Sequence, residues 1–139
     1  MPSIIKQQII PEAGGNEGLF YPVNLPDFEK VDSYISKAEG NILYIQIMKD
    51  KSGKKLILAY NCYDDNGKAV NTFGLTHSKL PFTTDSFDLG DEGWIGFDGK
   101  NWKISTRTAN KIITITYNDE KILSEISAKI FQDITNAGL

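Results

Sequence analysis

Residues 102–139 constrain the fold more than any other stretch of this chain. Apolar and polar residues alternate in residues 95–106 and 111–117, and the Asp98-Gly99 pair suits the tight turn inside the first of these runs. After Asn118, which suits a helix N-cap, the period changes to four residues, the spacing of one helix side. The predicted apolar stripe consists of Ile122, Ile126, Ile130 and Ile134, joined by Leu123, Phe131 and Ala137. We therefore predict a β-hairpin, one further strand and an amphipathic helix that packs on the sheet and stops at Gly138.

A second hairpin is predicted earlier in the chain. Residues 42–48 and 56–63 are rich in β-branched and aromatic side chains, and Lys51-Ser52-Gly53-Lys54 between them is typical of a hairpin turn. Pairing about Ser52-Gly53 would place one apolar set on the same face, namely Leu43, Ile45, Ile47, Leu56, Leu58, Tyr60 and Cys62. The opposite face is also largely apolar, so we expect this hairpin to lie centrally in the sheet, covered on both sides.

The remaining segments complete the predicted α+β fold. Pro26 suits a helix start, and apolar residues recur at helical spacing up to Ala38, which predicts a first helix over residues 26–38. Asn66-Gly67 predicts a tight turn, with residues 68–75 pairing back as a strand, and residues 76–90 are less regular. Residues 1–23 contain a Gly-rich, polar stretch and are interpreted as a flexible N-terminal extension to a domain over residues 24–139.

Composition limits the function classes. A net charge of −3 gives no general attraction to a phosphate backbone, so we expect no nucleic-acid partner. The single cysteine cannot form an internal disulfide, and residues 1–10 lack the pattern of a secretory signal. No run approaches the ~20 apolar residues that span a bilayer. These observations predict a soluble, cytoplasmic protein.

No set of residues predicts an enzyme. Cys62 and His77, the only thiol and imidazole, should lie roughly 20 Å apart along the expected strand, too far for a catalytic dyad. An acidic group, Asp85, Asp88, Asp91 and Glu92, could hold a hard cation, but its spacing matches no EF-hand loop and favours a solvated loop. We predict neither a catalytic residue, a metal site nor a cofactor.

Trp94 is a candidate contact residue. It shares a face of its hairpin with Lys103, Ser105 and Arg107, and Trp and Arg are enriched where proteins bind one another. The alternative is that residues 76–90 cover it. The pattern alone favours neither.

A family resemblance adds a more specific expectation. Residues 103–120, which read KISTRTANKIITITYNDE, resemble the C-terminal signature of profilins, where a strand ending in basic residues is followed by a turn, an apolar strand and Tyr-Asp-Glu or a close variant. The similarity covers roughly residues 26–62 and 91–139. It implies a central antiparallel meander sheet with N- and C-terminal helices packed on it.

The resemblance also implies a function: binding of monomeric actin and regulation of actin polymerisation, with a cytoskeletal location. Carried over by position, the implied actin-binding residues are Trp94, Lys103, Arg107, Lys121, Ser124, Glu125 and Lys129. Many profilins also hold proline-rich segments and are regulated by phosphoinositides. The residues implied in proline binding are Phe28, Tyr34, Ile134 and Leu139.

Two departures from profilins predict weak or altered proline binding. Leu58 stands where the family usually has a Trp, and Asp133 stands where an aromatic residue or His is common. Residues 64–80 show no match to the helix that profilins place there, and the N-terminal extension could cover the groove between the terminal helices. The alternative function is a small hydrophobic-ligand carrier, in which a helix-grip-like cavity would be lined by residues such as Ile104 and Phe131.

Overall fold

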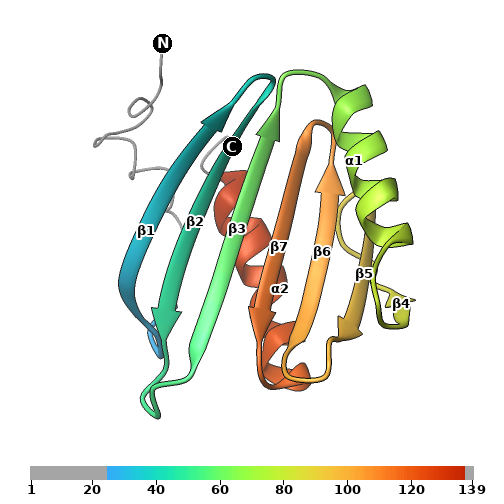
Figure 1. Ribbon diagram of the computed structural model, residues 1–139. Helices are drawn as coiled ribbons and strands as arrows, with labels where there is room; N and C mark the ends of the chain where they lie inside the picture. The colour runs from blue at the N-terminus through green and yellow to red at the C-terminus, as the bar shows by residue number, and fades with distance from the viewer. Residues whose placement is uncertain (1–24, 137–139) are drawn as a thin grey trace.

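The computed structural model describes residues 25–136, which fold as an α+β domain with one seven-stranded antiparallel sheet (Figure 1). In chain order the elements are β1 Glu29–Ala38, β2 Asn41–Lys49, β3 Lys55–Tyr63, α1 Asn66–Ser78, β4 Thr84–Ser86, β5 Glu92–Phe97, β6 Trp102–Thr108, β7 Lys111–Tyr117 and α2 Glu120–Asn136. The strand order is β1-β2-β3-β7-β6-β5-β4, so two meanders meet where β3 pairs with β7. The antiparallel sheet predicted from the sequence is confirmed. The extension predicted for residues 1–23 lies outside the described part, as do Gly138 and Leu139.

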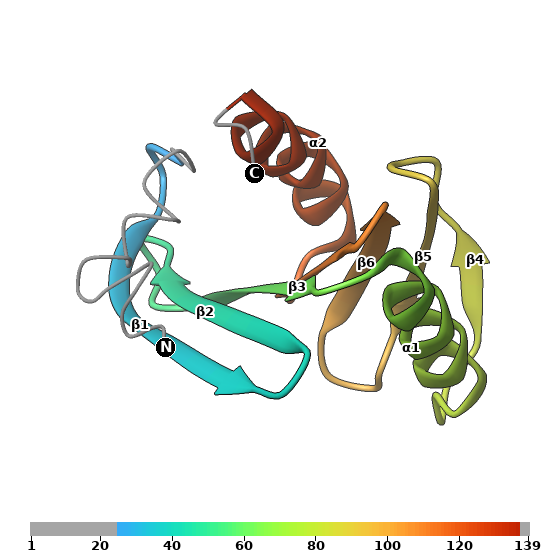
Figure 2. The same ribbon diagram turned by 90° about the horizontal axis from the view of Figure 1, so that it is seen from above.

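The two helices lie on opposite faces of the sheet (Figure 2). On the face that curves around α2, which we call the α2 face, Leu58, Ile104 and Ile115 pack against Leu123 and Ile130 of the helix. On the other face, the α1 face, Phe73 of α1 packs with Trp94 and Ile112. Burial of these apolar side chains is the main favourable term that holds each helix to the sheet.

The C-terminal third follows the prediction closely. The β5–β6 hairpin turns at Asp98-Gly99, where the Asp98 N–H donates to Asn101 O at 3.0 Å and Gly99 has a φ of 98°. The helix N-cap is Asp119, one residue later than predicted, because its carboxylate accepts the Ile122 N–H at 2.9 Å. The predicted apolar stripe of α2 is confirmed at Leu123, Ile130 and Ile134, which are buried. It differs at one edge, where Ser127 is buried and Ile122 is 38% exposed.

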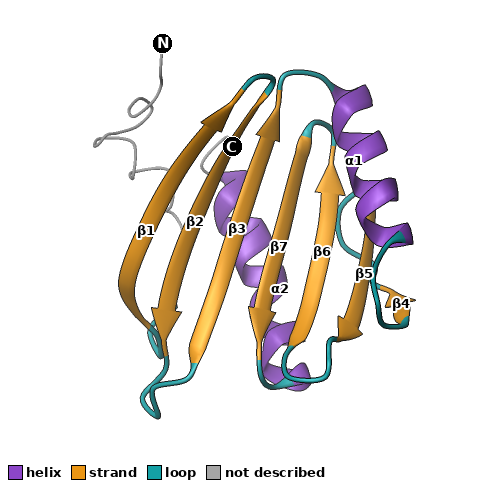
Figure 3. Ribbon diagram, in the orientation of Figure 1, coloured by secondary structure: helices purple, strands orange, loops and turns teal. Residues whose placement is uncertain are grey.

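The helix predicted over residues 26–38 is wrong, because the structure has the edge strand β1 there (Figure 3). β1 pairs with β2 along its length, and a bulge between Lys30 and Asp32 shifts the register. Ile35 packs toward the α2-face core, while Val31 and Tyr34 are 45% and 51% exposed. The helix-like spacing therefore reflects apolar residues on both faces of a bulged strand. The predicted packing of an N-terminal helix beside the C-terminal one is absent from residues 25–136.

The strand predicted over residues 68–75 is also wrong. Asn66-Gly67 does not form a hairpin turn but begins α1, whose N-cap Asp65 accepts the Lys68 N–H at 2.8 Å. Ala69 and Phe73, four residues apart, are the buried residues of this helix. Their packing against the sheet outweighs the low helix propensity of Gly67 and Gly74.

The β2–β3 register differs by one residue from the prediction. The loop between the paired residues Lys49 and Lys55 spans five residues, and the Asp50 carboxylate accepts the N–H groups of Ser52 and Lys54 at 2.8 and 2.9 Å. Met48 therefore pairs with Leu56, and Ile47 with Ile57. A one-residue slip moves every side chain to the other face. Leu56, Leu58 and Tyr60 thus face α2, away from Ile45 and Ile47.

Neither helix in residues 25–136 combines the length and the apolar character needed to span a bilayer.

Candidate functional site

Trp94 is buried on the α1 face and is 4% exposed. The His77 ring stacks on it with centroids 5.6 Å apart and planes at 12°, and Phe82 meets it edge-on at 6.1 Å. The register confirms that Trp94 shares a face with Ser105. Of the two interpretations, coverage by residues 76–90 is the correct one, so Trp94 offers little surface to a partner.

Arg107 holds the β6–β7 turn to the start of β5. Its side chain is only 13% exposed, Nε lies 2.6 Å from a Glu92 carboxylate oxygen, and Nη1 lies 3.6 Å from Asp91. Nη1 also donates to Ala109 O at 2.9 Å, while the Ala109 N–H donates to Asp91 at 2.8 Å. Ala109 needs this support, because its φ of 53° is uncommon for a residue other than glycine. The predicted actin contact Arg107 is thus occupied in stabilising the turn.

Lys103 also lies on the α1 face, where its ammonium donates to Thr116 Oγ1 at 3.2 Å and lies 3.8 Å from Asp98. Of the four acidic residues that were predicted to lie in a solvated loop, Asp91 and Glu92 pair with Arg107. Within residues 25–136, no three His, Cys, Asp or Glu side chains are close enough together to hold a metal ion.

The predicted actin-binding residues of α2 lie on the other side of the sheet. Lys121, Glu125 and Lys129 are exposed and Ser124 is half-buried, on the side of α2 that faces away from the sheet. Lys129 pairs with Asp133 at 2.8 Å, four residues along the helix. The seven predicted actin-binding residues therefore do not form one surface. Four lie on α2, and Trp94, Lys103 and Arg107 lie on the opposite face of the sheet, the α1 face.

The residues predicted to bind proline-rich segments do not form one aromatic groove. Tyr34 lies on the α1 face, where its hydroxyl donates to Asp32 at 2.7 Å. Ile134 is 3% exposed in the core, and Leu139 lies outside the described residues. Phe28 is half-buried and packs edge-on against Tyr117 with ring centroids 5.4 Å apart.

Phe28 lies in a surface groove of about 460 Å³ between the start of β1, the β2–β3 turn and α2. We call it the Phe28 groove. Its apolar wall is formed by Phe28, Tyr117, Ile122 and Ile126, and its polar rim by Asp27, Asp50, Lys51, Ser52 and Glu125. The groove continues the exposed side of α2, because Ile122 and Glu125 belong to both.

Asp50 and Tyr117 fix the geometry at the base of this groove. The Tyr117 hydroxyl donates to Asp50 Oδ2 at 2.5 Å, and the other carboxylate oxygen accepts from Ser52 and Lys54. These hydrogen bonds, chiefly that from Tyr117, lower the pKa of Asp50 well below its usual range. Burial, followed by the hydrogen bond to Asp50, raises the pKa of Tyr117 to about 12. The sequence pattern did not identify Asp50, which directly precedes the predicted turn at Lys51-Ser52-Gly53-Lys54.

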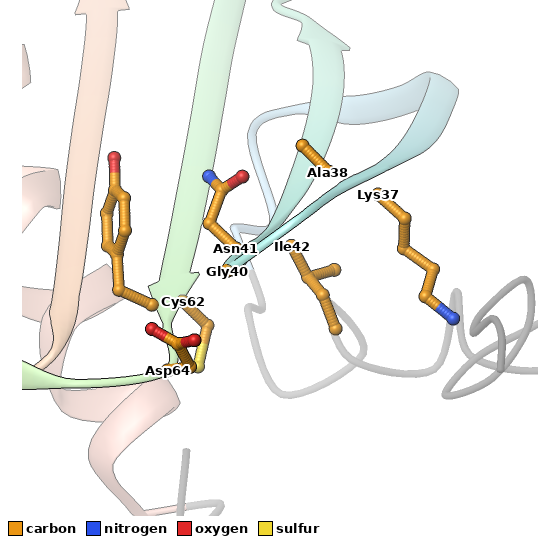
Figure 4. Close-up of a pocket in the computed structure, with 8 residues that line it drawn as sticks. Lys37, Ala38, Gly40, Asn41, Ile42, Cys62 and Asp64 are labelled. Carbon is orange, nitrogen blue, oxygen red and sulfur yellow. The ribbon is translucent and has the colours of Figure 1, made fainter. Parts of the chain in front are cut away.

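A smaller pocket of about 320 Å³ lies at the β1–β2 turn (Figure 4). Lys37, Ile42, Cys62 and Asp64 are among the residues that line it. Burial raises the pKa of the Cys62 thiol, so the thiolate that a nucleophile requires is disfavoured. Cys62 packs toward the α2-face core, whereas His77 stacks on Trp94 on the opposite side of the sheet. No dyad is formed.

The space that a ligand carrier would need between the sheet and α2 is filled. Ile104, Leu123 and Ile130 are fully buried within one apolar cluster. Phe131 packs against the same cluster and also lines a surface pocket with Leu89 and Ala128. The continuous pocket expected between Ile104 and Phe131 is therefore not formed by the described residues.

The α1 face of β1–β3 carries apolar side chains that no described helix covers (Figure 1). We call it the open sheet face and define it by Tyr34, Leu43, Ile45, Ile47, Ile57 and Ala59, which are half-exposed or exposed. α1 lies beside it, packed on β3, β7 and β6. The sequence predicted a hairpin with apolar residues on both faces. Because the predicted β2–β3 register was wrong by one residue, it did not identify which residues lie together on this face. Coverage on both sides was expected, and the described residues provide it only on the α2 face.

Comparison of the chain with protein-family models and with curated proteins gives no match.

Proposed function

We propose that this protein is a non-enzymatic protein-binding domain that contacts monomeric actin through the exposed side of α2 and the adjoining Phe28 groove. The observation that carries the proposal is the position of Ile122, an apolar side chain 38% exposed between Lys121 and the groove. An apolar residue with charged neighbours beside a groove is the common composition of a protein-binding surface.

The choice of actin rests on the resemblance of residues 103–120 to profilins and on the α2 positions Lys121, Ser124, Glu125 and Lys129. It does not use Trp94, Lys103 or Arg107, which lie on the α1 face. A profilin-like fold is part of the same proposal, with support from the β6–β7–α2 unit. The strand β1 in place of a helix, and the position of α1 and α2 on opposite faces, count against it.

Binding of proline-rich segments and of phosphoinositides belongs to the same proposal in a reduced form. Of the described residues implied in proline binding, Phe28, Tyr34 and Ile134, only Phe28 lies in the Phe28 groove. The groove rim carries three carboxylates, Asp27, Asp50 and Glu125, and one cation, Lys51, so its net negative charge opposes the approach of a phosphate group. Phosphoinositide binding would therefore need another surface.

The test is an actin polymerisation assay with an excess of the full chain. We expect the protein to slow assembly, and the double variant Lys121→Glu/Ile122→Ser to weaken the effect at least about tenfold, as loss of a central contact does. The matched control is Lys100→Glu/Phe97→Ser, which removes a lysine and an exposed apolar side chain at the β5–β6 turn. Unchanged assembly at a large excess of the protein would rule out actin as the partner.

A further inference from the structure

The rim of the Phe28 groove carries acids that are not paired within the domain. Asp27 precedes β1 and Glu125 lies in the second turn of α2, so the two carboxylates belong to different elements. Both residues are exposed, and neither forms an ion pair within residues 25–136. Lys51, the one cation among the described residues that line the groove, forms no ion pair there either. The groove therefore presents two carboxylates to a cation from another molecule.

The third carboxylate of the rim, Asp50, adds negative charge but no free acceptor position. Oδ2 accepts from the Tyr117 hydroxyl, and Oδ1 accepts from the N–H and the hydroxyl of Ser52 and from the N–H of Lys54. An ionised carboxylate has about four acceptor positions, which these donors fill. Asp50 therefore acts at a distance, by making the potential in the groove more negative. Direct hydrogen bonds to a ligand would come from the two exposed acids.

We propose that the Phe28 groove receives an arginine side chain of the partner protein. The inference rests on the proposed function, because it requires a protein to dock on the exposed side of α2. The aliphatic stem of an arginine would lie along Ile122 and Ile126. Its planar guanidinium stacks on aromatic rings such as that of Phe28, and its five N–H donors can pair with Asp27 and Glu125 together.

The groove is formed before a partner arrives. The Phe28 N–H donates to Leu25 O at 3.0 Å, and Leu25 is buried in the α2-face core with 8% of its surface exposed. The Phe28 ring is half-buried against Tyr117, which leaves part of it accessible. The opposite wall is part of α2, whose first turn is capped by Asp119. A wall held in this way loses little conformational entropy on binding.

Other occupants fit the groove less well. An acidic side chain would be repelled by the net negative rim. A purely apolar side chain would cover the wall, but it would also remove water from Asp27 and Glu125 without giving them a partner, which is costly for a charge. A lysine carries the required charge, but its ammonium is strongly hydrated and lacks the planar group that stacks on a ring. An arginine covers the apolar wall and pairs the acids with the same side chain.

The test is a titration of the full chain with three capped tripeptides, acetyl-Leu-Arg-Leu-amide and the same peptide with Lys or Gln at its centre. Chemical shifts of the backbone amides in NMR spectra report both the affinity and the place of binding. We expect the arginine peptide to shift the signals of Ile122 and Glu125 with a dissociation constant on the order of millimolar. The glutamine peptide should bind about fivefold more weakly, as loss of two half-exposed charge contacts implies. The lysine peptide should lie between them.

The double variant Asp27→Asn/Glu125→Gln removes the two charges while keeping the shape of the rim. It should bind the arginine peptide about fivefold more weakly than the wild type and the glutamine peptide equally well. The matched control is Asp85→Asn/Asp88→Asn, which removes two exposed acids at and after β4, at the other edge of the sheet. The control should bind like the wild type. Raising the salt from about 50 to about 500 mM should weaken the arginine peptide and leave the glutamine peptide unchanged.

Three results would overturn the inference. They are equal binding of the three peptides, arginine-peptide binding that survives Asp27→Asn/Glu125→Gln, and shifts confined to signals outside the groove. The actin assay fails or succeeds separately. If wild type and this double variant slow actin assembly equally, the actin proposal stands and the arginine site is wrong. If the groove binds the arginine peptide as expected but actin assembly is unchanged, the arginine site stands and actin is not the partner.

Discussion

Asp50 connects three parts of the molecule through one carboxylate. It accepts from Tyr117 at the end of β7 and from Ser52 and Lys54 within the β2–β3 turn, next to the first turn of α2. Because all of these donors stabilise the charged form, the carboxyl group has a lowered pKa in the folded protein. Its contribution to stability therefore depends on pH.

The sign of this dependence follows from the direction of each shift. The lowered pKa of Asp50 gives stability above the unfolded value of about 3.9, which is lost as the pH falls below it. The raised pKa of Tyr117 gives stability below pH 10, which is lost as the pH rises from 10 to about 12. In Tyr117→Phe we expect a shallower acid loss and a smaller loss in the alkaline window, measured by urea unfolding across the pH range. Some alkaline loss remains, because burial also raises the pKa of Tyr60.

Tyr34→Phe is the control for this measurement. The Tyr34 hydroxyl also donates to a carboxylate, that of Asp32, but the pair is exposed and its interaction is screened by solvent. Its pH profile should match that of the wild type. A Tyr117→Phe profile that also matched would show that the Asp50 bond adds nothing to stability.

Ser127 is a polar side chain in an apolar position. It is fully buried, and its hydroxyl has no hydrogen-bond partner among residues 25–136. Ser127→Ala removes this uncompensated hydroxyl and improves helix propensity, so it should raise the free energy of unfolding by about 0.5–1 kcal/mol. Ser124→Ala on the same helix should give only the propensity part, a few tenths of a kcal/mol. A destabilised Ser127→Ala protein would mean that the hydroxyl is satisfied after all.

At the scale of single elements, the turn between β6 and β7 depends on a distant pair of acids. Arg107 joins Glu92 and Asp91 to the carbonyl of Ala109, so Arg107→Ala should lower the free energy of unfolding by about 1–3 kcal/mol, the range for hydrogen bonds to charged groups. Lys103→Ala, which removes longer contacts, should cost less than about 0.5 kcal/mol. Urea unfolding of both variants checks this. Equal losses would contradict the structural role of Arg107.

Elements defined by local patterns could be predicted from the sequence. The C-terminal elements form largely as expected, namely the β5–β6 hairpin, β7 and α2. Their turns and caps are adjacent in sequence to the strands and the helix whose ends they determine. The same local rules misidentified β1, where pairing with β2 decides the conformation, and α1, where the burial of Ala69 and Phe73 decides it. Tertiary contacts of this kind are not visible in spacing alone.

The candidate sites were less predictable than the fold. Ile122 belongs to the predicted apolar stripe of α2, but it is 38% exposed, while Ser127, which was not part of the stripe, is buried. The Phe28 groove brings together residues from four separate segments of the chain, and no sequence motif predicts that these segments meet. The outward positions Lys121, Glu125 and Lys129 could be predicted, since they follow from the helix period.

At the scale of the whole molecule, the sheet separates two surfaces of different composition. The α2 side offers charged residues and a groove, while the α1 side offers the apolar open sheet face.

The same separation divides the intrinsic fluorescence of the protein. The chain has two tryptophans, and the sheet places Trp94 with α1 and Trp102 with the α2-face core. Trp94 stacks on His77 of α1 and would respond to changes on that side of the sheet. Trp102 pairs across the sheet with Tyr117 of the Phe28 groove and would respond to events there. Emission from single-tryptophan variants therefore distinguishes the two sides of the molecule without an added dye.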